Sequence, residues 1–161
     1  MAVLFRYRKP TGTDEHLLAA AGTWLVSRPG DALTRGDTLD FARLEGLRLV
    51  LPRRPAHWRA VLDETARSKG FTLNAEVEAD SLRLQKELVA HTEHVYALLG
   101  PYSITEELRA GRLHAARVVN PDLQRHVTLA LPRQGQLTPA SRIVAQLVRE
   151  TVQLWGHRLS G

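Results

Sequence analysis

The chain has 161 residues, 43% of them hydrophobic, which is enough to bury a core in one domain or in two small lobes. It contains no cysteine, so the sequence excludes disulfide bonds, thiolate metal sites and cysteine nucleophiles. The formal net charge is +5, but the basic residues are spread along the chain and no basic run exceeds two residues. This spread favours a solvated surface over a nucleic-acid interface, which needs clustered lysine and arginine.

The N-terminal segment carries two short apolar runs, Ala2–Phe5 and Thr23–Ser27, which favour strands. Too little helical pattern lies between or after them to make a crossover. A parallel α/β domain rarely begins in this way, so we expect further strands and helices upstream in the complete protein, whether this chain is a natural fragment or a shortened one. No run is long enough for a signal peptide or a membrane span, and the expected location is cytoplasmic, without membrane contact.

The next region has the pattern of a strand, a helix and a second strand. Leu47–Leu51 is an apolar run that ends where two prolines, Pro52 and Pro55, prevent the strand from continuing. A helix is predicted from Pro55 onward, with an apolar face that includes Trp58 and with Gly70 as its stop. Residues 73–78 alternate apolar and polar side chains, which is typical of a strand with one buried face.

The second half of the chain continues the alternation. Asp80 or Ser81 can cap a helix that ends near Thr92. Ser103 and Glu106 predict a capping box for a short helix. The other predicted elements are strands at Val95–Leu99, Leu113–Val119 and Val127–Leu131 and a long helix from Pro139. Together these elements predict an α/β fold with a mostly parallel sheet flanked by helices, in which ligands bind outside the carboxyl ends of the strands.

Several segments resemble, in unbroken order, the effector-binding domain of LysR-type transcriptional regulators. The resemblance spans about residues 2–151, and its weight lies in the order, because no single motif is diagnostic. It departs from the family at Thr92-Glu93-His94, where a glycine-rich turn is usual, and in lacking the helix-turn-helix and the first part of lobe one. The segments that carry it are Leu44–Pro55, Ala79–Ser81 with Leu88–Ala90, Tyr96–Ser103, Glu107–Leu113, and Leu129–Arg133 with Leu137–Ala145.

The resemblance implies a fold like that of periplasmic binding proteins, with a small-molecule effector between two lobes. It implies that residues 1–43 are a remnant of the first lobe and the crossover, residues 44–120 the complete second lobe, and residues 121–161 the return strand and C-terminal helix of the first lobe. The implied function is non-catalytic effector sensing in a homo-oligomeric bacterial regulator that contacts DNA only through a helix-turn-helix domain absent from this chain.

The candidate ligand-binding residues lie in two turns, Pro52-Arg53-Arg54-Pro55 and Gly100-Pro101. Arg53 and Arg54 stand between a strand end and a helix N-terminus, where guanidinium and backbone N–H donors can converge on an anion. The resemblance favours Arg53 as the inward-facing arginine, and it implies a small organic anion as the effector. The alternative is that both arginines are solvated turn residues and that Gly100-Pro101 is only a turn.

Other functions find weaker support in the sequence. His91 and His94 flank Glu93, but their spacing matches no zinc motif, so surface or capping roles are favoured over metal binding. The sequence has no phosphate loop with its lysine and no nucleophile elbow, so we expect no enzyme activity and no cofactor. The remaining alternatives are a periplasmic-type solute-binding protein, a small α/β enzyme and, after these, a nucleic-acid-binding module.

Overall fold

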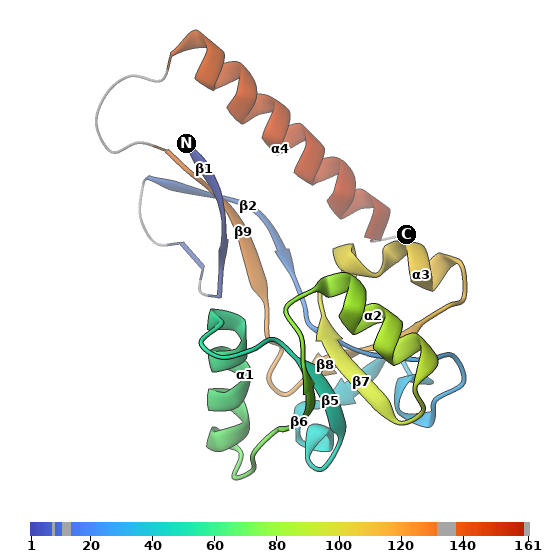
Figure 1. Ribbon diagram of the computed structural model, residues 1–161. Coiled ribbons are helices and arrows are strands. Elements are labelled where there is room, and N and C mark those ends of the chain that lie inside the picture. The colour runs from blue at the N-terminus through green and yellow to red at the C-terminus, as the bar shows by residue number, and fades with distance from the viewer. Residues whose placement is uncertain (8, 11–13, 132–137, 160–161) are drawn as a thin grey trace. The chain divides into compact units, whose positions relative to one another are not determined.

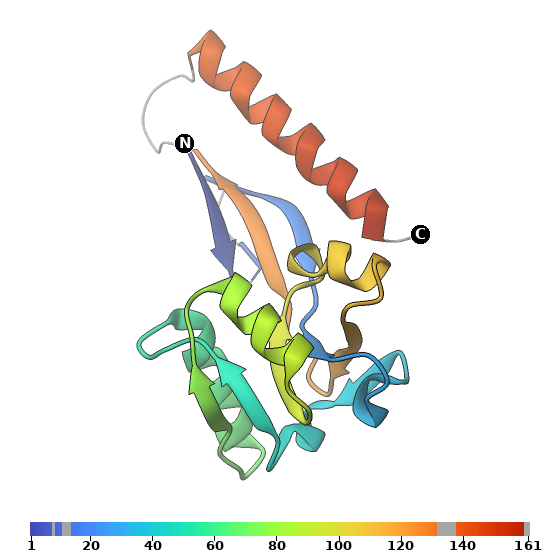
Figure 2. The same ribbon diagram turned by 45° about the vertical axis from the view of Figure 1, so that its right-hand side comes forward.

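A computed structural model describes residues 1–7, 9–10, 14–131 and 138–159 of the chain. The chain divides into two compact units, one made of residues 1–21 with 124–161 and the other of residues 22–123. Figures 1 and 2 show the elements of both units. The predicted segments Leu129–Arg133 and Leu137–Ala145 are described only at positions 129–131 and 138–145, since residues 132–137 lie outside the described part.

The larger unit is built on a six-stranded sheet in the order β4-β8-β3-β7-β5-β6. Three of its pairings are parallel (β4 with β8, β5 with β6, β5 with β7), whereas β3 runs antiparallel to both of its neighbours. The prediction that the segments around residues 47–51, 73–77 and 95–99 join one sheet is therefore confirmed. The strands are β3 (Trp24–Ser27), β4 (Thr38–Asp40), β5 (Arg48–Leu51), β6 (Asn74–Glu78), β7 (Val95–Leu99) and β8 (His114–Val119).

Helices cover both faces of this sheet, so a central strand can be buried on both sides. All five residues of β7 are buried, as a strand covered on two sides requires. In Figure 2, α2 lies in front of the sheet and α1 behind it. The helical elements are η1 (Ala32–Thr34), η2 (Phe41–Leu44), α1 (His57–Ser68), α2 (Leu82–His91), η3 (Pro101–Ser103) and α3 (Thr105–Arg109).

The local signals at the ends of these helices were partly correct. Gly70 follows α1 with a φ of 88°, a left-handed conformation that favours glycine, so the predicted helix stop is confirmed. Of the two candidate caps for α2, Ser81 takes the role, since its hydroxyl accepts from the N–H of Leu84. The predicted capping box at Ser103 is wrong: Ser103 lies in η3, and its hydroxyl donates to the carbonyl of Gly100 over 2.7 Å.

The smaller unit contains a three-stranded antiparallel sheet in the order β1-β9-β2 and a long helix, α4 (Pro139–Leu159), which packs against β2. Its strands are β1 (Ala2–Arg6), β2 (Glu15–Ala21) and β9 (Arg125–Ala130). No local signal in the sequence indicates β2, because the run of leucines and alanines in this strand lacks β-branched residues and has no strict alternation. Its pairing with β9 makes it a strand, which local propensity did not indicate.

Candidate functional site

The predicted turn Pro52-Arg53-Arg54-Pro55 lies at the carboxyl end of β5 and leads into α1. The register of β5 against β7 pairs Val50 with Ala97, so β5 and β7 end at the same edge of the sheet. The turn and Gly100-Pro101 therefore share this edge, which we call the carboxyl edge. Both candidate segments are thus brought together, as the strand order requires.

Arg53 is held in this turn by the carboxylate of Asp80, which follows β6. The backbone N–H of Arg53 donates to Oδ1 of Asp80 over 2.9 Å, and its Nε donates to Oδ2 over 3.1 Å. The side chains are 67% and 54% exposed, respectively, so both can be reached by a solute. Both hydrogen bonds from Arg53 lower the pKa of Asp80, and the one from the backbone N–H has the larger effect.

Arg54 points to a different carboxylate. Its Nη2 lies 2.9 Å from Oδ2 of Asp63, a residue of α1, and its own side chain is 63% exposed. Adjacent residues in an extended turn point in different directions, and here this divides the two arginines between two acidic partners. The structure places Arg53 toward β6 and Arg54 along α1.

Arg59 lies beneath the turn, a position that the sequence pattern did not predict. Its side chain is only 3% exposed and donates to Asp63, to Glu78 over 2.8 Å and to the carbonyl of Pro52 over 3.0 Å. Burial lowers the pKa of Arg59, but the hydrogen bonds and charges of Asp63 and Glu78 outweigh burial and raise it overall. The helical pattern around Arg59 did not indicate that this side chain is buried, because an arginine on a helix is usually exposed.

Gly100 and Pro101 form the neighbouring part of the carboxyl edge. The carbonyl of Gly100 accepts from the N–H and the hydroxyl of Ser103, which fixes η3. A Cβ built on Gly100 would meet no atom within 4 Å, so the space above this backbone is open. A small molecule can therefore approach the main chain here more closely than at a residue with a side chain.

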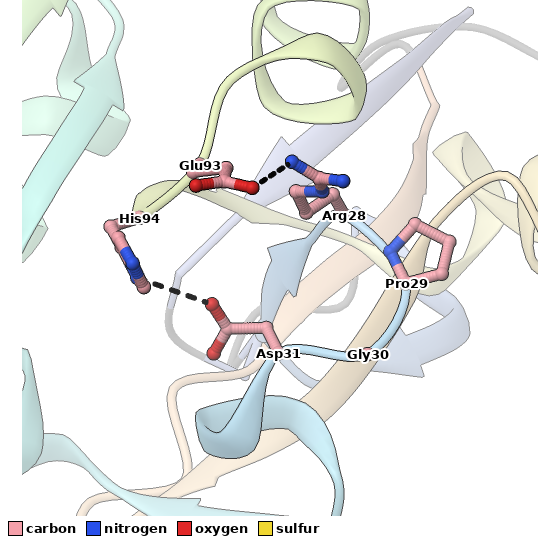
Figure 3. A pocket seen from close by; sticks show the side chains of 6 residues that line it. All are labelled: Arg28, Pro29, Gly30, Asp31, Glu93 and His94. Carbon is pink, nitrogen blue, oxygen red and sulfur yellow. Dashed lines mark hydrogen bonds and ion pairs between the residues drawn. The ribbon is translucent and has the colours of Figure 1, made fainter.

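A second feature of the larger unit is a pocket of about 280 Å³ between the loop that follows β3 and the turn that precedes β7 (Figure 3). The pocket lies at the opposite, amino edge of β7, since β3 runs antiparallel and Val26 pairs with Ala97. An ion pair of 2.7 Å between Arg28 and Glu93 joins the two segments. The lining residues are Arg28, Pro29, Gly30, Asp31, Glu93 and His94.

Asp31 is the buried carboxylate of this pocket. Its side chain is 8% exposed, and its Oδ2 accepts from the hydroxyl of Tyr96 over 2.9 Å. Burial, followed by the hydrogen bond and charge of Asp31, raises the pKa of Tyr96 to about 12. Tyr96 therefore stays protonated and donates over the whole physiological pH range.

The structure gives His91 and His94 separate surroundings. Nε2 of His91 lies 3.3 Å from Oε2 of Glu87 on α2, whereas Nδ1 of His94 lies 3.9 Å from Oδ2 of Asp31. Within the described residues, no three metal-ligating side chains come together, and no helix there is long and apolar enough to cross a bilayer.

The sequence matches the family described as LysR substrate binding domain over residues 1–153, whereas no curated protein matches it significantly. The fold is similar to the CcmR regulatory domain of Synechocystis PCC6803 in complex with 2-PG (TM-score 0.75, 11% identity, 93% of this chain and 73% of that chain). It is also similar to full-length CbnR complexed with the target DNA (TM-score 0.66, 16% identity, 93% and 50%). A third similar structure is the effector binding domain of QuiR in complex with shikimate (TM-score 0.69, 12% identity, 94% and 71%).

These identities are low, so the solved structures establish the shared fold, and the sequence match establishes the family. The chain spans half the length of full-length CbnR. The α/β architecture described above is the one these regulatory domains share. The chain belongs to the LysR substrate-binding domain family.

Proposed function

We propose that this chain is the effector-sensing, non-catalytic part of a LysR-type bacterial transcriptional regulator that acts in the cytoplasm. The observation that carries the proposal is the match to the substrate-binding family over residues 1–153. Two proteins of the same fold were solved with small molecules, CcmR with 2-PG and QuiR with shikimate. DNA binding is then the task of a helix-turn-helix domain outside these 161 residues, as in a protein like CbnR that was solved with its target DNA.

We propose further that residues 44–120 are the second lobe, with residues 1–43 and 121–161 as pieces of the first lobe and the crossover. All of residues 44–120 fall within the larger compact unit. In this reading the carboxyl edge of the six-stranded sheet faces the effector, because α/β sheets bind ligands outside the carboxyl ends of their strands.

The proposed effector is a small organic anion that binds at Arg53, next to the open backbone of Gly100. In the described structure, Asp80 accepts hydrogen bonds from the backbone N–H and the Nε of Arg53. The N–H groups on the two Nη atoms of Arg53 are therefore left to donate to an effector. The N-terminus of α1 can add backbone N–H donors, since its cap residue Ala56 makes no side-chain hydrogen bond to them. Guanidinium and helix N-terminal donors favour a carboxylate or phosphate group.

The test is calorimetry of the full-length regulator against a panel of aromatic and aliphatic carboxylates. A hydrogen bond from Arg53 to a carboxylate contributes roughly 1.5 to 3 kcal/mol, so Arg53→Ala should weaken binding of the effector about ten- to a hundredfold. Arg54→Ala is the matched control and should change the affinity by about threefold at most, because Arg54 is turned toward Asp63. Unchanged affinity in Arg53→Ala would remove this site from consideration.

The rival readings are a periplasmic-type solute-binding protein and a small α/β enzyme. Turnover of any ligand by the purified protein would establish the enzyme. Binding of the same ligand without any effect on operator affinity of the full-length protein would favour the solute-binding protein. An effector-dependent change in operator binding, measured at fixed salt because phosphate contacts are salt-dependent, supports the regulator.

We also propose that the chain forms a homo-oligomer through β6 and α1. β6 ends the strand order of the six-stranded sheet, and an uncovered edge is a template for pairing. Sedimentation at rising protein concentration should show self-association, and Asn74→Lys on β6 should weaken it. Thr38→Lys on β4, at the other end of the strand order, is the control and should leave it unchanged. A strict monomer at high concentration would contradict the proposal.

A further inference from the structure

The pocket at the amino edge of β7 is separate from the proposed anion site, because the two lie at opposite ends of the same strands. Four of its six lining residues, Arg28, Asp31, Glu93 and His94, carry polar or charged side chains, and the other two are Pro29 and Gly30 (Figure 3). Gly30 has a φ of 87°, and a Cβ placed on it would meet no atom within 4 Å. The space above this loop is therefore open, and the loop conformation favours a residue without a side chain.

The carboxylate of Asp31 is neutralised by no close cation among the described residues. Its Oδ1 accepts from the backbone N–H of Leu33 and its Oδ2 from the hydroxyl of Tyr96, each over 2.9 Å. Both donors are neutral, so they satisfy hydrogen bonds without cancelling the charge. The nearest basic group is His94, whose Nδ1 lies 3.9 Å from Oδ2, too far for a direct hydrogen bond. A carboxylate that is more than nine-tenths buried thus faces the pocket with its charge uncompensated.

The rest of the lining makes the pocket net negative while His94 is neutral. Glu93 supplies a second carboxylate, and Arg28, which pairs with it, supplies the one guanidinium of the lining. Neutral imidazole can accept a hydrogen bond at one nitrogen, so three of the lining side chains, those of Asp31, Glu93 and His94, carry acceptors. We propose that this pocket binds the primary ammonium group of a small amine.

The chemistry of the ligand follows from the lining. A primary ammonium group carries one positive charge and three N–H donors, which matches three acceptors and a net negative pocket. The volume of about 280 Å³ limits the ligand to a small molecule. A quaternary ammonium ion has the same charge but no N–H donor, so the pocket should discriminate against it.

The experiment is an NMR titration of the ¹⁵N-labelled chain with ethanolamine at about pH 8, where a primary amine is protonated. The backbone amides of Gly30 and His94 should shift and saturate. Choline and sodium chloride at equal concentrations are the matched controls and should produce no saturable shift. Shifts of equal size with choline, or no saturation by about 50 mM ethanolamine, would overturn the proposal.

Two variants locate the binding. Asp31→Asn keeps an oxygen acceptor but removes the charge, and it should weaken ethanolamine binding at least fivefold. Glu93→Gln changes a side chain that is 70% exposed, so it keeps the fold intact, and it should weaken binding as well. Arg67→Ala, at an exposed position of α1, should leave the affinity unchanged. Wild-type affinity in Glu93→Gln and Asp31→Asn together would contradict the site.

Discussion

At the carboxyl edge of the six-stranded sheet, both arginines of the turn are matched by carboxylates, whereas at the amino edge the buried Asp31 is held by two neutral donors. The carboxyl edge thus presents a cationic side chain whose geometry is fixed by its counter-ion. The amino edge presents an anionic side chain whose charge is left to a solute or to His94. Charge and exposure together, not the number of basic residues, therefore decide which solute each edge can accept.

The largest expected effect tests the buried support of the carboxyl edge. Arg59→Met should lower the free energy of unfolding by about 3 kcal/mol, because it leaves Asp63 and Glu78 without their shared cation and frees the carbonyl of Pro52. Urea denaturation measures this loss. Arg67→Ala, which removes an exposed ion pair on the same helix, is the control and should cost less than about 1 kcal/mol. An equal loss of unfolding free energy in the two variants would show that Arg59 stabilises the fold no more than an exposed ion pair does.

The next effect concerns the amino edge at high pH. The pKa of Tyr96 rises from 10.0 to about 12 on folding, so the folded state holds this proton more tightly than the unfolded state. The stabilisation is complete below about pH 10 and is lost as the pH rises toward about 12. The free energy of unfolding should therefore fall across this window, and the fall should be smaller in Tyr96→Phe. A fall of the same size in the wild type and in Tyr96→Phe would show that other groups cause the loss of stability.

Asp31→Asn separates the effect of burial on Tyr96 from the effect of the Asp31 charge. Burial is the largest cause of the shift of Tyr96 and persists in the variant, whereas the charge of Asp31 is removed. The phenol should then titrate at a lower pH than in the wild type but still above 10.0. Ultraviolet absorbance of the phenolate, with Tyr96→Phe subtracted, measures the change.

The smallest expected effect concerns Asp80. Asp80→Asn keeps an oxygen that can accept from the N–H of Arg53 but removes the negative charge beside the guanidinium. An anionic effector should bind the full-length Asp80→Asn regulator about threefold more tightly, since both side chains are exposed and the repulsion is screened. The same substitution in an Arg53→Ala background should have a smaller effect, because the anion is then no longer held beside residue 80. Weaker binding in Asp80→Asn would mean that Asp80 positions Arg53 more than it opposes the anion.

The sequence alone predicts the alternation of strands and helices in the larger unit, because apolar runs bounded by proline and glycine are local signals. It also determined that the turn after β5 and Gly100-Pro101 lie at one edge, since parallel neighbouring strands end together. It did not indicate β2, whose pairing with β9 is a contact between residues far apart in the chain.

The partners of the charged residues, in contrast, depend on the folded structure. Arg53 meets Asp80 across 27 positions and Arg28 meets Glu93 across 65, and no spacing rule relates such positions. The burial of Arg59 and of Asp31 likewise follows from how α1 and the loop after β3 pack on the sheet. Local patterns report the conformational preferences of neighbouring residues, whereas ion pairing and desolvation depend on distances that exist only after the chain has folded.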